Sequence, residues 1–175
     1  SAPLAITEGE KKTAALIQSG IMTVGVGGIW NWIDGQSRKA IQELDEIAWV
    51  ERDVRFYFDS DIWHRPDLLK PVYAFGKELE SRGASIQIFV IEQAGQDKVG
   101  IDDLLAANGA EVLATLKSIF LSHKAFSQAS SWWKSWNSKN HIGPDPKCPD
   151  LKNAIQSIRK TPSEVLRAFE KKQDI

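Results

Sequence analysis

Two acidic clusters follow strand-like runs in this sequence, and their residue types could hold a divalent metal ion. Glu8 comes shortly after the apolar run Pro3–Ile6, and Asp59 and Asp61 come directly after the run Val54–Phe58. Since parallel strands bring their carboxyl ends to one edge of a sheet, we expect these three carboxylates to share that edge. A Glu facing an Asp-x-Asp pair makes an oxygen-rich site suited to Mg²⁺, for which Mn²⁺ can substitute. This favours phosphoryl-transfer chemistry on nucleic acid over redox chemistry on small molecules.

Each of these carboxylates has an expected role. Asp59 and Asp61, two residues apart at the end of a strand, can point to the same side and bind the metal ion. Glu8 comes from another strand and can act across the metal as a ligand or as a general acid or base. A single Asp-x-Asp more often caps a loop, but two acidic clusters at matching places favour a site.

Two lysines follow the first acidic cluster and could bind phosphate. Lys11 and Lys12 come after Glu8 and Gly9, at the expected start of a helix. Free backbone N–H groups at a helix N-terminus bind anions, and two ammonium groups would strengthen such a site. The alternative is that both lysines are ordinary surface charges.

Three tryptophans lie in loops that we expect at the same edge of the sheet. Trp30 and Trp32 follow a glycine-rich turn, and Trp63 follows the second acidic cluster. Aromatic rings beside a cationic groove stack on unpaired bases, and each such contact is worth about 1–3 kcal/mol. The alternative is that these rings pack onto their own domain.

Alternating strand and helix patterns predict an α/β fold with a four-stranded, mainly parallel sheet flanked by helices. Short apolar or β-branched runs predict strands at residues 4–7, 21–26, 53–58 and 85–91. Helical spacing predicts helices at residues 10–19, 38–47, 66–82, 102–107 and 110–121. Gly20 and Gly83 are the expected stops of the first and third of these helices. We therefore expect an α/β domain over residues 1–121 and a helical extension over residues 122–175.

The C-terminal part of the chain is basic and contains several tryptophans. Residues 111–175 carry 11 Lys and Arg against 6 Asp and Glu, whereas residues 1–110 carry 11 against 17. A basic tail on an acidic domain favours an anionic partner, and a solvated helical face is the alternative. Helical spacing of Trp132 and Trp136, beside Trp133, favours docking of this segment on the α/β domain or on a neighbour.

Composition restricts the class of protein. The 175 residues, 42% apolar and 26% charged, are typical of one globular domain. No apolar run reaches the roughly 18 residues that a membrane span requires, so we expect no membrane partner. The single Cys148 excludes a disulfide within these residues and favours a reducing cytoplasm. The chain begins without Met, and we expect a fragment of a larger protein or a short stand-alone domain.

Several sequence blocks resemble a known family. "ITEGEKK", the glycine turn in "VGVGG" and "RFYFDSD" resemble the Toprim domain of bacterial primases, topoisomerases and some nucleases. The blocks "TEGEKKTAALIQSGIMTVGVGGIWNW", "LDEI", "FDSD" and "KVGIDDLL" more closely resemble an uncharacterised Toprim-like domain of phage, plasmid and cyanobacterial proteins, often joined to replicative helicases. The resemblance covers about residues 3–110 and implies a Rossmann-like fold.

The resemblance also implies roles for particular residues. Glu8 would be the Toprim glutamate, acting as acid or base or assisting metal binding, and Asp59 and Asp61 would be the Asp-x-Asp that holds Mg²⁺. Asp102, together with Asp103, occupies the place of a further acidic pair that follows the fourth strand in primase-like relatives. Gly100 stands where the primase pattern has its earlier Asp.

The function implied is a Mg²⁺-dependent nucleic-acid-processing domain of a DNA primase or primase–helicase system in phage or plasmid DNA replication. Its expected partners are DNA or RNA, nucleoside triphosphates and a helicase or other replication domain. Two alternatives stay open. The same carboxylates could serve a Toprim-type nuclease that cleaves phosphodiesters, or the domain could be a non-catalytic DNA-binding or docking module.

Overall fold

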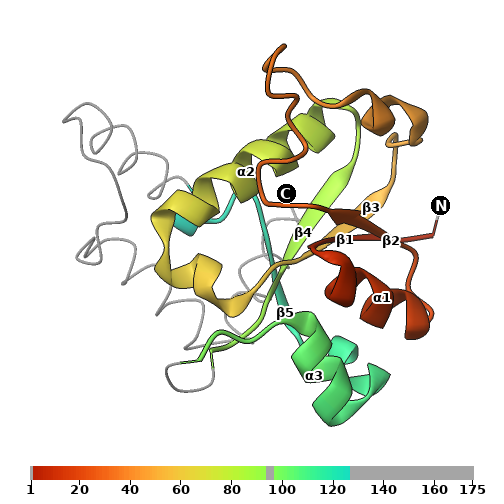
Figure 1. The fold of residues 1–175 in the computed structure, drawn as a ribbon, viewed down its shortest axis with the longest axis vertical. Coiled ribbons are helices and arrows are strands. Elements are labelled where there is room, and N and C mark those ends of the chain that lie inside the picture. Colours follow the sequence, from red (N-terminus) through yellow and green to blue (C-terminus); the bar gives the residue numbers. More distant parts are fainter. Residues whose placement is uncertain (1, 94–96, 127–175) are drawn as a thin grey trace, which may run out of the picture.

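The protein is described by a computed structural model that defines residues 2–93 and 97–126, and these residues form an α/β fold of the Rossmann-like kind (Figure 1). Five strands form one sheet in the order β2-β1-β3-β4-β5. Their bounds are β1 Leu4–Glu8, β2 Thr23–Val26, β3 Asp53–Tyr57, β4 Ser85–Val90 and β5 Lys117–Phe120. The first four strands are parallel, and β5 pairs antiparallel with β4. The predicted α/β class is confirmed, with one strand more than expected.

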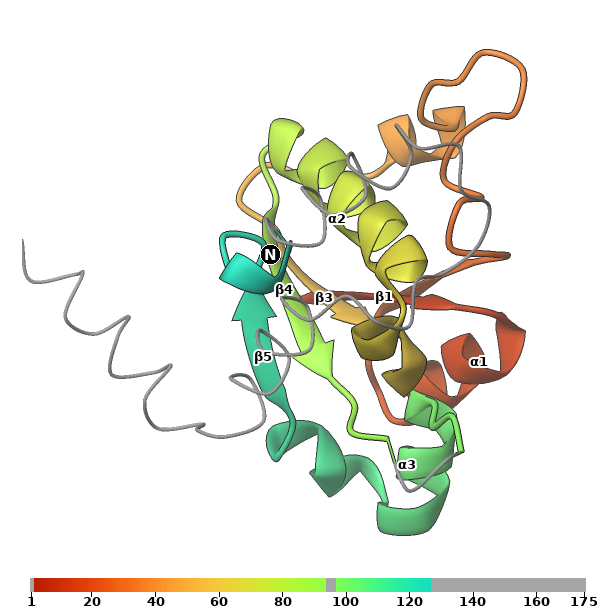
Figure 2. The same cartoon turned by 90° about the vertical axis from the view of Figure 1, so that its left-hand side faces the viewer.

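Helices cover both faces of the sheet. The α-helices are α1 Glu10–Gln18, α2 Pro66–Ser81 and α3 Ile101–Asn108, and three short 3₁₀ helices are η1 Gln42–Glu46, η2 Ser60–His64 and η3 Ala110–Ala114. Helix α2 lies on one face, and α1 and α3 lie together on the other (Figures 1 and 2). Gly20 and Gly83 follow α1 and α2 with φ of 78° and 95°, a left-handed conformation that glycine adopts without steric cost.

The core follows from the alternation of side chains along the strands, which sends successive residues to opposite faces. On the α2 face, one cluster contains Leu4, Ile6, Val54, Phe56, Ile86, Ile88, Leu69, Val72, Phe75 and Leu79. On the face of α1 and α3, a second cluster contains Ala5, Leu16, Tyr57, Phe89, Ile91, Ile101 and Leu105. Burial on both faces explains why these strands read as nearly continuous apolar runs in the sequence.

The order of the strands defines a switch point between β1 and β3. The chain passes from β1 through α1 to β2 on one side, and from β3 through α2 to β4 on the other. Because such crossovers are right-handed, the two helices lie on opposite faces and separate at the carboxyl ends of β1 and β3. Open α/β sheets bind their ligands in the crevice at this place.

The helix predicted at residues 38–47 is wrong: only the 3₁₀ turn Gln42–Glu46 forms there. Arg38 has a φ of 59°, which no α-helix accepts, and an antiparallel bridge joins Ile33 to Ala40. The segment between β2 and β3 is therefore an irregular loop with one 3₁₀ turn. It packs on the α2 face through Trp32, Leu44 and Trp49.

The helix predicted at residues 110–121 is also wrong. Its first part is the 3₁₀ turn Ala110–Ala114, and its second part is strand β5. In β5, Ile119 pairs with Ile88 of β4, and its side chain is buried in the core. Pairing with the open edge of β4 satisfies backbone groups that a helix would satisfy internally.

Phe126, the last described residue, packs beside α2 and belongs to the core. Phe126 is 1% exposed, and its ring lies 6.3 Å from that of Trp63 and 5.9 Å from that of Tyr73, between ring centroids. The remainder of the extension predicted at residues 122–175, with Trp132, Trp133 and Trp136, lies outside the described residues. Among residues 2–93 and 97–126, none of the helices has the length and apolar character needed to span a bilayer.

Candidate functional site

The carboxyl ends of β1 and β3 are joined by a buried side-chain hydrogen bond. Thr7 pairs with Tyr57 in the sheet register, and the Thr7 hydroxyl donates to the Tyr57 carbonyl oxygen at 2.7 Å. Glu8 is the next residue along β1, and Asp59 lies two residues beyond Tyr57. Glu8 and Asp59 therefore follow neighbouring parallel strands at the switch point.

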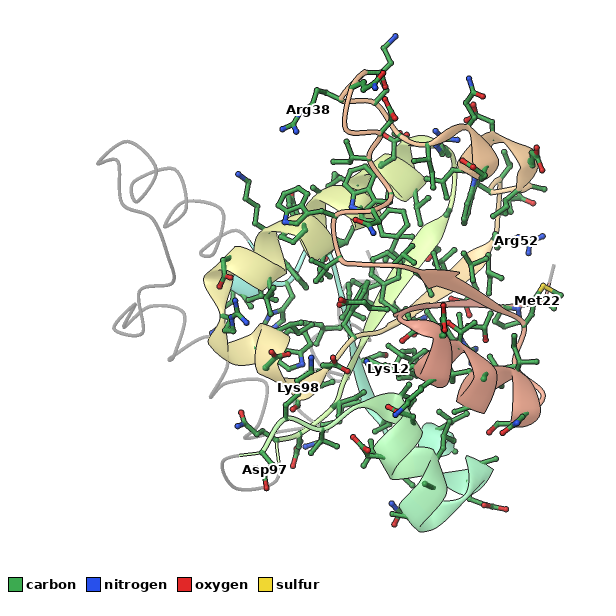
Figure 3. All side chains as sticks on the ribbon, in the orientation of Figure 1. Lys12, Met22, Arg38, Arg52, Asp97 and Lys98 are labelled. Atoms are coloured by element: carbon green, nitrogen blue, oxygen red, sulfur yellow. The ribbon has the colours of Figure 1, made fainter. Side chains whose placement is uncertain are left out.

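Asp59 is the buried centre of this edge, with 4% of its surface exposed. Two lysines from different elements contact it: Nζ of Lys12 on α1 lies 3.1 Å from Oδ1, and Nζ of Lys98 lies 2.6 Å from Oδ2. Figure 3 labels both lysines, and it shows Asp97, beside Lys98, pointing outward. A carboxylate so deeply buried requires a compensating positive charge, and these two ammonium groups supply it.

The two lysine contacts differ in kind. Nζ of Lys98 lies 2.6 Å from Oδ2, and its hydrogen bond to Asp59 raises the pKa of Lys98, whereas Nζ of Lys12 lies 3.1 Å from Oδ1 as an ion pair. Oδ1 of Asp59 accepts no hydrogen bond within the described structure. This oxygen of the buried carboxylate is thus neutralised by the ion pair with Lys12 alone.

The negative charges of all three predicted carboxylates act on Lys98, and Asp59 contacts it directly. The pKa of Lys98 is raised, first by its hydrogen bond to Asp59 and then by the negative charges of Asp59, Asp61 and Glu8, which together outweigh partial burial. Lys98 was not among the residues predicted from the sequence. Its position between the last parallel strand and the following helix, at the same sheet edge, was the available signal.

A pair of hydrogen bonds holds the backbone next to Lys98. The backbone N–H of Ser60 donates to the carbonyl oxygen of Val99 at 2.9 Å, and the N–H of Val99 donates to Oγ of Ser60 at 2.8 Å. Ser60 is fully buried and directly follows Asp59. This contact fixes the segment before α3 against the end of β3, so Lys98 is positioned beside Asp59.

Gly100 packs directly against the Lys12–Asp59 pair. A Cβ atom at this position would lie 2.9 Å from Cε of Lys12 and 3.1 Å from Oδ1 of Asp59, and it would also collide with Oδ1 of Asp102. No larger residue fits this arrangement without a shift. The space that an earlier Asp would need, as in the primase pattern, is therefore taken by the lysine and the two carboxylates.

The acidic pair after β4 divides into two roles. Oδ2 of Asp103 accepts the backbone N–H of Gly100 at 2.8 Å and so caps the start of α3. The Asp103 carboxylate, predicted as a metal ligand, therefore has a structural role as the cap of α3. Asp102 is half-buried, and a Cβ atom at Gly100 would lie close both to Oδ1 of Asp102 and to Oδ1 of Asp59.

Asp61 lies in a different structural element from the one predicted. Strand β3 ends at Tyr57, and Asp61 lies in the 3₁₀ turn η2, so its direction is not set by strand alternation. Its Oδ2 lies 3.9 Å from a guanidinium nitrogen of Arg65, a long ion pair. Asp61 nevertheless contributes to the field at Lys98.

The residues predicted to bind phosphate are not equivalent. Gly9 has a φ of 87°, and its N–H donates to the Val26 carbonyl oxygen at 2.9 Å, so this N–H is not available to an anion. Within the described residues, Lys11 is exposed and forms no ion pair, whereas Lys12 contacts Asp59. Lys12 is therefore the member of the pair that belongs to the site.

The three loop tryptophans differ in burial. Trp30 is 43% exposed, which leaves its ring open to a ligand. Trp32 is buried and stacks on Phe75, with ring centroids 5.0 Å apart and an interplanar angle of 8°. Trp63 is 2% exposed. The expected stacking of bases on Trp32 and Trp63 is wrong, because core side chains already cover their rings.

The donor set fits Mg²⁺ by chemical type. In the described residues no three His, Cys, Asp or Glu side chains are grouped closely enough to enclose a metal ion by themselves. Mg²⁺ does not require such a group, because it binds through one or two carboxylates and retains several waters. Asp59 and Asp61, two residues apart after the end of β3, supply the one or two carboxylates that this smaller requirement names.

Comparisons with known proteins place the chain in a family. The chain is 34% identical over 125 residues to an uncharacterised protein of Picosynechococcus sp., and the match covers 63% of the chain. It spans only 12% of that relative's length. No solved structure matches the chain. Residues 1–112 match the model of a family described as a domain of unknown function (DUF3854), and the chain therefore belongs to this family.

Proposed function

We propose that this domain is a Mg²⁺-dependent nucleic-acid-processing module of a DNA primase or primase–helicase system, with a primase-type nucleotidyltransferase activity. The observation that carries the proposal is the burial of Asp59 directly after β3, beside the end of β1 that carries Glu8, with Lys12 and Lys98 on its two oxygens. Carboxylates at this place suit a divalent metal ion and a phosphate ester. The resemblance of "TEGEKK" and "FDSD" to Toprim motifs supports the same chemistry.

The residues at the edge have complementary roles in this proposal. Asp59 and Asp61 would hold Mg²⁺, which when bound neutralises charge that develops on phosphate oxygens. Glu8 is half-buried at the end of β1 and, among the described residues, has no ion-pair partner within 4 Å. It is thus available to exchange a proton with an attacking hydroxyl group. Exposed Trp30 offers a surface on which an unpaired base can stack.

The partners follow from the chemistry of the site. A primase-type reaction needs a DNA template and nucleoside triphosphates, and its products are short nucleic-acid strands. The relative from Picosynechococcus sp. is much longer than the chain, which is compatible with a helicase or another replication domain in the same polypeptide. The single Cys148 is consistent with a reducing cytoplasm.

A non-catalytic module is the second candidate, and a specific observation favours it. Asp59 is already neutralised by two lysines, and the described residues contain no group of three metal-binding side chains. In that case the acids serve the fold, and the domain binds DNA or another protein. A Toprim-type nuclease would use the same carboxylates as the primase to activate water at a phosphodiester.

Metal binding is the experiment that tests the proposal. Mn²⁺ or Mg²⁺ is titrated calorimetrically into the wild type and a Glu8→Gln/Asp59→Asn/Asp61→Asn variant, and a structure is determined with Mn²⁺. A matched control, Glu10→Gln/Glu43→Gln/Asp97→Asn, removes the same charge from exposed positions. We expect the wild type and the control to bind the metal ion and the first variant to lose it.

Activity assays then separate the candidates. Product formation that depends strictly on nucleoside triphosphates favours primer synthesis, whereas cleavage without nucleotides favours the nuclease. If no metal binds to the folded wild type at millimolar concentration, the catalytic proposal is wrong and the non-catalytic module takes its place.

A further inference from the structure

Asp59 holds two positive charges that come from separate parts of the chain. Lys12 belongs to the first turn of α1, and Lys98 belongs to the segment between β4 and α3. Their ammonium groups lie 3.1 Å and 2.6 Å from the two oxygens of one carboxylate that is 4% exposed. The lysines thus supply, at this buried carboxylate, the charge that a divalent cation would also supply.

A divalent cation at Asp59 and the two lysine contacts exclude one another. Both would occupy lone pairs of the same carboxylate, and like charges held within a few ångströms repel strongly where water is scarce. One ligand can therefore bind Asp59 only to the extent that the other leaves. This competition is a direct consequence of the distances at Oδ1 and Oδ2.

Lys98 has room to leave Asp59 without leaving the site. The Lys98 side chain is 56% exposed, so its ammonium group can turn toward solvent at low cost. The Ser60–Val99 hydrogen bonds keep its backbone at the sheet edge while the side chain moves. Lys12 is less exposed, at 18%, and remains at the first turn of α1.

We propose that Lys12 and Lys98 are exchangeable counter-ions of Asp59: a divalent cation displaces them, and the released ammonium groups then bind the phosphate groups of the nucleic-acid substrate. This inference rests on the proposed metal site and adds that the metal ion binds before the phosphate groups of the substrate. Without metal, the lysines are engaged and the carboxylates repel phosphate. With metal, two cations at the sheet edge are free to receive it.

The proposal requires that metal and phosphate strengthen each other's binding. By thermodynamic linkage, the factor by which metal raises the affinity for phosphate equals the factor by which phosphate raises the affinity for metal. Removal of one lysine must then have opposite effects on the two ligands. Metal binds more tightly because a competitor is gone, and phosphate binds more weakly because a ligand is gone.

Neutral substitutions at single lysines test these opposite effects. The variants are Lys98→Gln and Lys12→Gln, and the matched control is Lys11→Gln, which removes an exposed lysine next to Lys12. Calorimetry with Mn²⁺ alone gives the metal affinity. Fluorescence anisotropy of a labelled single-stranded oligothymidylate, with and without saturating Mn²⁺, gives the affinity for a phosphate backbone.

We expect both test variants to bind Mn²⁺ at least about fivefold more tightly than the wild type, the lower end of typical coupling between sites. In saturating Mn²⁺ they should bind the oligonucleotide at least about fivefold more weakly. Lys11→Gln should leave the Mn²⁺ affinity unchanged. Lys98→Arg should keep the metal affinity near that of the wild type, because the competing cation is retained.

The outcomes distinguish this inference from the proposed function. If no folded protein in the series binds Mn²⁺, both are overturned. If the wild type binds Mn²⁺ and Lys98→Gln binds it no more tightly, the exchange of counter-ions is overturned and the metal site stands. Should Lys12→Gln fail to fold, Lys98→Gln decides the question, because its side chain is largely exposed.

Discussion

The ammonium group of Lys98 lies 2.6 Å from Oδ2 of Asp59, and this contact joins the segment before α3 to the end of β3. Buried Asp59 is thereby part of the fold and of the candidate site at once. Substitutions near it are expected to change both stability and ligand binding.

Gly100→Ala should destabilise the protein. The new Cβ would lie 2.9 Å from Cε of Lys12 and 3.1 Å from Oδ1 of Asp59, so the ion pair must shift. Overpacking of this kind costs about 1–3 kcal/mol of unfolding free energy. Urea unfolding measures it, with Gly35→Ala as the control, because nothing lies within 4 Å of a Cβ at Gly35. Equal stability of the two variants would contradict close packing of Gly100 against Lys12 and Asp59.

Thr7→Val should weaken the junction of β1 and β3. The substitution keeps the shape of the side chain but removes the 2.7 Å hydrogen bond to the Tyr57 carbonyl oxygen. Loss of a buried hydrogen bond costs about 1–2 kcal/mol. Thr115→Val removes a similar bond, to the Val112 carbonyl oxygen, at an exposed position and should cost less. Chemical unfolding of both variants checks the difference, and a larger cost at Thr115 would argue against a special role for Thr7.

Trp30→Ala and Trp32→Ala should have opposite signatures. Trp32 is 6% exposed and stacked on Phe75, so its removal should cost about 3–5 kcal/mol of stability. Trp30 is 43% exposed, and its removal should leave the melting temperature nearly unchanged. If a base stacks on it, oligonucleotide affinity in Mn²⁺ should fall by a factor that corresponds to about 1–3 kcal/mol. Unchanged affinity in Trp30→Ala would exclude stacking at this residue.

Acid should destabilise the protein through His123. Burial lowers the pKa of His123 below its ordinary value of 6.5, and the charge of Lys124 adds to the effect. The folded state therefore favours the neutral ring, whose Nδ1 accepts the N–H of Ala125 at 3.2 Å. This stability is complete above the unfolded pKa and is lost as the pH falls below about 6.5 toward the lower folded pKa.

Comparison with a His123→Asn variant isolates that effect. Asn can accept the same backbone N–H but does not titrate in this range. The difference in unfolding free energy between wild type and variant should become smaller as the pH falls from 7.5 toward 5. A difference that stays constant over this range would show that His123 does not titrate on unfolding.

The sequence predicts much of the α/β domain because the signals are local. Strands β1, β3 and β4 contain apolar residues buried on both faces, and glycines with positive φ follow α1 and α2. Glu8, Asp59 and Asp61 can be found because the carboxyl ends of parallel strands meet at one edge. Topology places Glu8 and Asp59 after neighbouring strands, whereas Asp61 lies in the following 3₁₀ turn.

The errors arise where stability comes from contacts distant in the sequence. Ile41, Leu44 and Ile47 have a spacing of three, which fits a 3₁₀ turn as well as an α-helix, and nothing in this spacing reveals the positive φ of Arg38. Strand β5 has four residues and forms because β4 offers an open edge. No local pattern encodes such pairing.

The contact of Lys98 with Asp59 was not predicted, for a similar reason. In the sequence it is one lysine among polar residues, and only the fold brings it to Asp59. Likewise, the burial of Trp32 depends on Phe75, which lies 43 positions further along the chain. Roles that depend on a single distant partner are visible only once the partner is known.

The burial of Phe126 determines where the polypeptide can be shortened. A chain that stops after Leu121 loses the ring that covers Trp63 and Tyr73, and it exposes apolar surface on α2. If such a truncated chain bound nucleic acid more weakly, unfolding or aggregation could not be distinguished from loss of a binding segment. A chain that stops after Phe126 keeps this aromatic contact, so it is the truncation that can assign nucleic-acid binding to the basic tail.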